Sequence, residues 1–160
     1  MSDRPSPTTA TTFDSRATDV REERRIALHA LHVLEYALSA PAPRRHRTWL
    51  HRVNIAIDAL HAALRTQLHT DRLPMGLLDE IALSNPGYLA PIQCLRQDLL
   101  DLTIAVASLR EQIEPDPAIA TDPDEIRERL ATLTSKFRQH QAREADLVYE
   151  ATGFDLDEAI

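Results

Sequence analysis

A histidine and a glutamate near the end of the chain have the spacing of half a metal site. His140 and Glu144 stand four residues apart, so in a helix both side chains leave from one face. The same face carries apolar residues at helical spacing, namely Leu133, Phe137, Leu147 and Ala151. An inward imidazole and carboxylate suit iron or manganese. A buried hydrogen-bonded pair without metal also fits this pattern, and the sequence leaves both interpretations open.

Three more polar side chains are predicted on the apolar sides of earlier helices. Gln67 and Asp71 are again four residues apart, and only the aspartate is a good metal ligand. Glu35 lies beside Leu31 and Leu38, where it is either a ligand or the partner of an arginine within the bundle. The candidate metal ligands are therefore His140, Glu144, Asp71 and Glu35.

The other six of the seven histidines are weaker candidates. At about 100° of rotation per residue, three of them point away from the apolar face of their helix: His29, His51 and His69. His32 and His61 lie at its border, and His46 stands close to the inward side at the frayed start of a helix. The third helical segment has no histidine, and Asp98 and Asp101 fall to the side of its aliphatic stripe.

Four long segments with helical periodicity must position these side chains: residues 19–39, 45–70, 89–113 and 122–151. The third is the most regular, with apolar steps of three and four at Ile92, Leu95, Leu99, Leu102, Val106, Leu109 and Ile113. A shorter helical piece, residues 77–83, precedes an Asn-Pro-Gly turn. Asp122 and Pro123 predict the start of the last helix. With no strand pattern, the sequence predicts an all-α, antiparallel up-down-up-down four-helix bundle.

The length of 160 residues fits one domain that can bury a core. Residues 1–18 are rich in Ser, Thr and Pro and are predicted to form a disordered tail. The bundle is expected over residues 19–151, and residues 152–160 are expected to be a C-terminal tail. The composition, 43% hydrophobic with only 4% aromatic residues, is typical of a core built from aliphatic side chains.

Charge and cysteine content narrow the range of partners. A formal net charge of −7 disfavours nucleic acid, and the basic run at residues 44–47 is interpreted as a solvated loop. Residues 1–17 have no continuous apolar stretch of the kind that a signal peptide or a membrane span requires. The single Cys94 excludes an internal disulfide and favours the cytoplasm, although the sequence does not say whether this thiol is reactive.

Three phrases of the sequence resemble a known family. They are residues 76–81 (GLLDEI), residues 89–96 (LAPIQCLR) and, most specifically, residues 140–151 (HQAREADLVYEA). Together with the helix spacing, they make the chain similar to the bacterial hemerythrin-like (HHE cation-binding) domains over residues 21–155. The resemblance implies a four-helix bundle whose inward histidines and carboxylates hold two non-haem irons that bind oxygen, nitric oxide or peroxide.

The chain departs from that family at the expected ligands. His140 and Glu144 match the ligand segment of the fourth helix, but Gln67 and Asp71 stand where the family has His-x-x-x-Glu. Leu99 or a neighbour stands where the third helix of the family carries a histidine. A di-iron site needs about five or more protein donors, so the ligand set is incomplete.

Two functions follow from this departure. The first is a non-enzymatic regulatory or interaction protein with a degenerate metal site, acting on an unknown protein partner or as a homodimer. The alternative is a non-haem iron or other metal protein that binds O2, NO or peroxide through an atypical site. A hydrolase or transferase is disfavoured, because the sequence has no phosphate-binding loop and no nucleophile with its base.

Overall fold

The computed structural model describes residues 7–41, 46–72, 76–113 and 122–158, with the side chains of residues 7–11 and 46 excepted. The described chain is helical and contains no strand, which confirms the predicted all-α class. Its elements are α1 (Pro7–Ser39), α2 (His46–Arg72), α3 (Leu77–Ser84), the 3-10 helix η1 (Pro86–Tyr88), α4 (Leu89–Ile113) and α5 (Pro123–Thr152). None of these helices is both long and apolar enough to cross a membrane.

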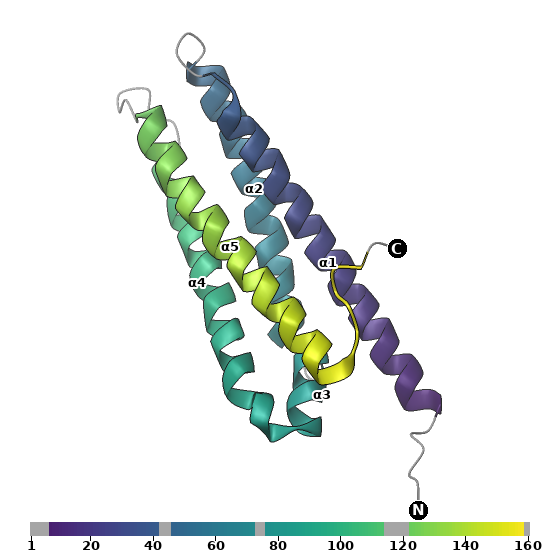
Figure 1. Cartoon of the computed structure of the whole chain (residues 1–160). Helices are drawn as coiled ribbons and strands as arrows, with labels where there is room; N and C mark the ends of the chain where they lie inside the picture. The colour runs from purple at the N-terminus through teal and green to yellow at the C-terminus, as the bar shows by residue number, and fades with distance from the viewer. Residues whose placement is uncertain (1–6, 42–45, 73–75, 114–121, 159–160) are drawn as a thin grey trace, which may run out of the picture.

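The four long helices lie side by side and form an elongated bundle (Figure 1). The end of α1 and the start of α2 meet at one end of the bundle, where α4 also ends and α5 begins, while α3 and η1 lie at the opposite end. Close backbone approaches join α1 to α2, α2 to α4 and α4 to α5, and they are far fewer between α1 and α5. Long side chains must therefore bridge the gap between α1 and α5.

Local signals explain both ends of α5. The Asp122 side chain accepts a hydrogen bond from the backbone N–H of Asp124 at 3.0 Å, and Pro123 occupies the first turn, as the sequence predicts. Gly153 ends the helix with φ of 75°, a left-handed conformation that favours glycine. Its N–H donates to the carbonyl of Tyr149 at 2.7 Å.

The first helix begins earlier than predicted. The expectation that residues 1–18 form a disordered tail is wrong for residues 7–18, which are the first turns of α1, and residues 1–6 lie outside the described ranges. Within these turns Ala17 is fully buried and Phe13 is half-buried, both packed near α3. Arg16 adds an ion pair to Glu80 of α3 at 2.9 Å. The many Ser and Thr residues masked this short apolar stripe in the sequence.

The segment after α5 also belongs to the packed structure. It turns back along α1 (Figure 1), and Leu156 is only 2% exposed. The Arg21 guanidinium lies over the Phe154 ring, 4.3 Å from its centroid. Part of the expected C-terminal tail is therefore a strap across α1.

The core consists of two apolar clusters separated by a polar layer. One cluster is formed by the four long helices, and the other lies around α3 and the C-terminal strap. Arg24 lies along α1 between Ala17 and Ala27, which belong to different clusters. On α5 the residues between Phe137 and Ala145 likewise separate them. This layer contains the candidate functional site.

Candidate functional site

His140 and Glu144 point into the bundle as the sequence predicts. The side chain of His140 is 3% exposed and that of Glu144 is 14% exposed. The Nε2 atom of His140 lies 3.8 Å from Oε2 of Glu144, which is too long for a hydrogen bond. Nδ1 of His140 is buried and has no partner among the described residues. The hydrogen-bonded histidine–glutamate pair, one of the two interpretations from sequence, is therefore not formed.

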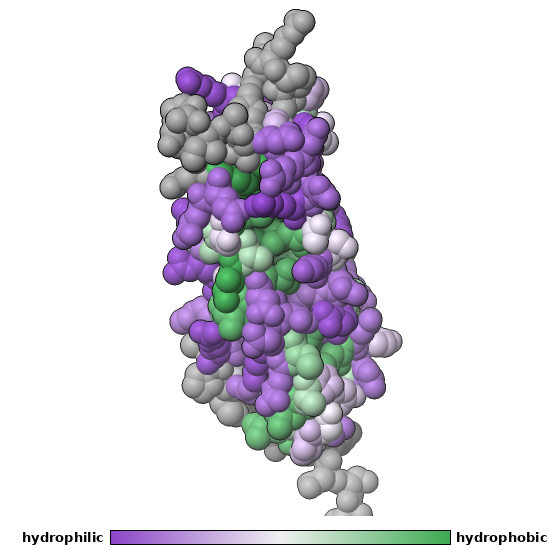
Figure 2. Space-filling model, turned by 90° about the vertical axis from the view of Figure 1, so that its left-hand side faces the viewer, coloured by the Kyte–Doolittle hydropathy of each residue, from purple (hydrophilic) through white to green (hydrophobic). Residues whose placement is uncertain are grey.

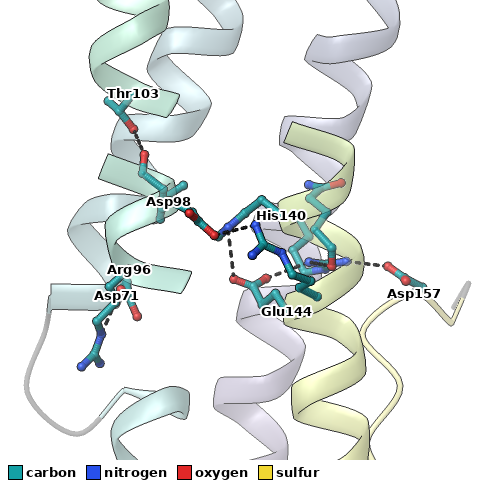
Figure 3. Close-up of polar contacts among 11 residues, drawn as sticks. Asp71, Arg96, Asp98, Thr103, His140, Glu144 and Asp157 are labelled. Atoms are coloured by element: carbon teal, nitrogen blue, oxygen red, sulfur yellow. Dashed lines mark hydrogen bonds and ion pairs between the residues drawn. The ribbon is translucent and has the colours of Figure 1, made fainter. Parts of the chain in front are cut away.

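The partner of Glu144 is Arg24, a residue that the sequence analysis missed. Its side chain is 5% exposed, and Nη1 donates to Oε1 of Glu144 at 2.7 Å. The same nitrogen approaches the carbonyl of Gln141 at 3.2 Å, and Nη2 donates to Asp157 of the C-terminal strap at 2.7 Å. Figure 3 labels Glu144 and Asp157, two of the partners of this guanidinium, and marks their contacts with dashed lines. Arg24 thus ties α1 to α5 and to the strap.

The sequence does contain a signal for the inward position of Arg24. Arg24 precedes Ala27 by three residues and Leu31 by seven, so it lies on the inward stripe of α1. All of residues 21–25 are charged, which hides this inward position in the sequence. Burial disfavours the charge, but Glu144 and Asp157 outweigh this and raise the pKa of Arg24. The guanidinium therefore stays positively charged.

Electrostatics keep His140 neutral. Burial lowers the pKa of the imidazole below its usual range, and the carboxylates of Glu144 and Asp98 offset this only in part. Asp98 itself is occupied by Arg143, whose Nη2 donates to it at 2.6 Å. A protonated imidazole would be repelled by the permanently charged guanidinium nearby, so this repulsion also favours the neutral form of His140.

Asp71 and Gln67 do approach Glu144, around a cavity of about 40 Å³ that they line together with Glu23. Asp71 accepts a hydrogen bond from Nε of Arg96 at 3.2 Å. Burial raises the pKa of the Asp71 carboxyl, although Arg96 opposes this. The structure therefore places Gln67 and Asp71 near Glu144, but Arg96 binds the Asp71 carboxylate.

Glu23 is a further acid that the sequence analysis did not single out. Its carboxylate accepts a hydrogen bond from Thr70 at 2.8 Å, and burial raises its pKa. Glu23 precedes the buried Ala27 by four residues and Ala30 by seven, so helical spacing does contain a signal for its inward position, whereas the adjacent Glu22 is exposed.

Glu35 does not join the other candidates. Both of its oxygens accept from Nη2 of Arg138, at 2.8 and 2.9 Å, and its side chain is 36% exposed. Arg138 stands two residues before His140 and so leaves α5 on nearly the opposite side. Of the two roles that the sequence left open for Glu35, the arginine partner is the one that the structure shows.

The third long helix places no metal-binding side chain inward. Leu99 is 4% exposed and lines the small cavity. The buried polar residue of α4 is Thr103, whose hydroxyl donates to the carbonyl of Leu99 at 2.7 Å. Four of the remaining histidines are exposed, namely His29, His32, His51 and His69. His61 is half-buried, and the side chain of His46 lies outside the described set.

Across the described ranges, no three or more side chains of His, Cys, Asp or Glu converge as metal ligands. Arginines bind the carboxylates of Glu144, Asp71 and Glu35, so the donors do not fit a di-iron centre. Comparison with known proteins assigns no family, since no family model, curated protein or solved structure matches the chain. The resemblance to hemerythrin-like domains stays a prediction from the sequence phrases.

Proposed function

We propose that the chain is a hemerythrin-like, up-down-up-down bundle in which Arg24 supplies the positive charge that a metal ion would otherwise supply. The protein then acts through its surface, as a non-enzymatic regulatory or interaction protein of the cytoplasm. The observation that carries this proposal is the 2.7 Å contact between Arg24 and Glu144 inside the bundle.

Charge repulsion supports the proposal. At an effective dielectric constant of about 20, two unit charges about 4 Å apart interact by about 4 kcal/mol, and a divalent ion doubles that figure. A metal bound to His140 and Glu144 would meet this repulsion from Arg24. Displacing the arginine would also leave its guanidinium buried without a partner.

A specific observation favours the alternative, a metal protein that binds O2, NO or peroxide. His140 carries an unpartnered buried nitrogen, and neutral imidazole is the form that binds metals. Glu144 and Asp71 also share the cavity of about 40 Å³, which exceeds the room that one water molecule needs. This reading requires Arg24 to swing out of the bundle.

Metal analysis of the wild type and of two variants distinguishes these two functions. The wild type and the variant Arg24→Met are expressed in iron-rich medium, purified without chelator and analysed for iron per chain. The proposal expects essentially no iron in the wild type. One or more equivalents in the wild type, with a near-ultraviolet oxo-bridge band, would overturn it. Arg138→Met, which removes an arginine from the bundle surface, is the matched control.

A further inference from the structure

A long groove runs along the face of the bundle where α4 and α5 lie next to each other. It encloses about 510 Å³, within the usual size of a binding site. Leu102, Leu109 and Leu133 are among the residues that line it, with Ala105 exposed between the helices. Figure 2 shows this side of the molecule, with apolar side chains visible between polar ones along the middle of the face.

The two walls of the groove repeat at the spacing with which helices pack together. On α4 four of the five lining residues, Asp98, Leu102, Ala105 and Leu109, are separated by four, three and four residues, and Asp101 is the fifth. On α5 the bases Arg129, Lys136 and Arg143 are separated by seven residues each. Steps of three, four and seven give a continuous stripe along a helix. The groove therefore offers a third helix two parallel rows of side chains.

The α5 wall is basic and partly unpaired. Arg129 pairs with Glu125 of its own helix, and Arg143 pairs with Asp98 across the groove. Lys136, the one lysine of the sequence, is exposed and has no ion pair or hydrogen bond within the described part of the chain. In a chain with a net charge of −7, this row of three bases is a local positive stripe, although the α4 wall opposite carries Asp98 and the exposed Asp101.

Shape argues against a second copy of the chain packed groove to groove. Two concave faces laid together would leave both hollows unfilled, whereas a single convex helix fills one hollow. The lining stretch of α5, residues 129–143, extends for about 21 Å at 1.5 Å per residue. An occupant of about four helical turns therefore matches the groove in length.

We propose that the groove between α4 and α5 binds one amphipathic helix of a partner protein, whose apolar seam covers Ala105 and Leu109 and whose carboxylates, seven residues apart, pair with the α5 bases. Helix-in-groove recognition of this kind uses apolar anchors and charged flanks. The inference rests on the proposed surface function and names the chemistry of the partner.

The probe is a 15-residue lactam-bridged helical peptide with leucines at steps of three and four and glutamates at positions 1, 8 and 15. A matched peptide carries lysines at those three positions. Fluorescence anisotropy with the full chain is expected to show saturable binding of the glutamate peptide, at least about tenfold tighter than the lysine peptide. Equal binding of both peptides, or no saturable binding of either, would overturn the proposal.

Two pairs of variants locate the binding site. Lys136→Glu breaks no contact of the described chain and should weaken the glutamate peptide about fivefold, while Arg65→Glu, the same charge change on an exposed α2 residue, should not. Ala105→Trp should abolish binding by filling the groove, while Ala131→Trp, elsewhere on α5, should leave it unchanged. Circular dichroism establishes that all four variants are folded. Binding that survives Ala105→Trp would place the peptide elsewhere and contradict the proposal.

Sedimentation velocity and iron content complete the experiment. A wild-type dimer that Ala105→Trp converts to monomer would assign the groove to a second copy and overturn the partner-helix proposal. Iron in the same wild-type preparations would instead contradict the proposed surface function. Peptide binding and oligomeric state therefore test the groove proposal, whereas iron content tests the proposed function, so each can be contradicted independently of the other.

Discussion

Nη1 of Arg24 lies 2.7 Å from Oε1 of Glu144 and joins the two neighbouring long helices with the fewest close backbone approaches, α1 and α5. The guanidinium extends across this gap and reaches Asp157 on the far side. A charge pair at this place holds the polar layer together between two apolar clusters. Most of the following predictions concern that layer.

Arg24→Met is expected to destabilise the protein by about 3 kcal/mol, because Glu144 stays largely buried without its cation. The double variant Arg24→Met with Glu144→Met should recover most of this loss, since no charge is left unpaired. Urea unfolding followed by circular dichroism measures both. Losses that simply add in the double variant would show that the two side chains are not coupled.

His140→Leu is expected to be neutral or stabilising. The change removes a buried nitrogen that has no partner and adds apolar surface to the layer. Thermal unfolding at pH 7 checks this expectation. A large drop in melting temperature that no added metal restores would mean that the interpretation of His140 is wrong.

The same histidine should make the stability of the wild type depend on pH. Burial lowers the pKa of His140 from its ordinary value of 6.5, so the unfolded chain binds a proton more readily than the folded chain. The contribution of His140 to the free energy of unfolding is therefore fully present above about pH 6.5 and is lost as the pH falls below that value. His140→Leu should flatten this part of the stability profile, and an unchanged slope would assign it to other groups.

The acids of the small cavity should give the opposite dependence. Burial raises the pKa of Glu23, so the folded chain keeps a proton that the unfolded chain releases, and stability is lost as the pH rises through the folded value. Glu23→Gln preserves an oxygen acceptor for Thr70 and should stabilise the protein at pH 7 with little effect near pH 4. Chemical unfolding at the two pH values tests this, with the exposed Glu22→Gln as control.

Substitutions at two adjacent residues test the early start of α1. Ala17 is fully buried, so Ala17→Asp should destabilise the protein by about 3 kcal/mol through an unpaired buried charge. Thr18→Asp places the same charge on the exposed side of the same turn and should change stability little. Similar effects of the two substitutions would contradict the helical packing of residues 13–20.

The sequence predicted the parts of the structure that depend on local periodicity. Apolar steps of three and four located α4 and α5, and rotation about α5 placed His140 and Glu144 inside. What it missed depends on contacts between helices. Whether Glu144 contacts a metal, His140 or Arg24 depends on the distance between α1 and α5. That distance cannot be derived from the spacing of residues within one helix.

The start of α1 was missed for a different reason. Ser and Thr dominate residues 8–18, and composition outweighed the stripe formed by Phe13, Ala17 and Val20. The role of Glu35 was predicted only as one of two alternatives. The sequence offered both a ligand and an arginine partner, and only the packing of Arg138 distinguished them.

Anomalous diffraction at the iron absorption edge, from crystals of protein expressed in iron-rich medium, shows whether a guanidinium or a metal ion neutralises Glu144. We expect the Arg24 guanidinium against Glu144 and no anomalous peak in the polar layer. A peak within bonding distance of His140 and Glu144, with Arg24 turned out of the bundle, would contradict this expectation.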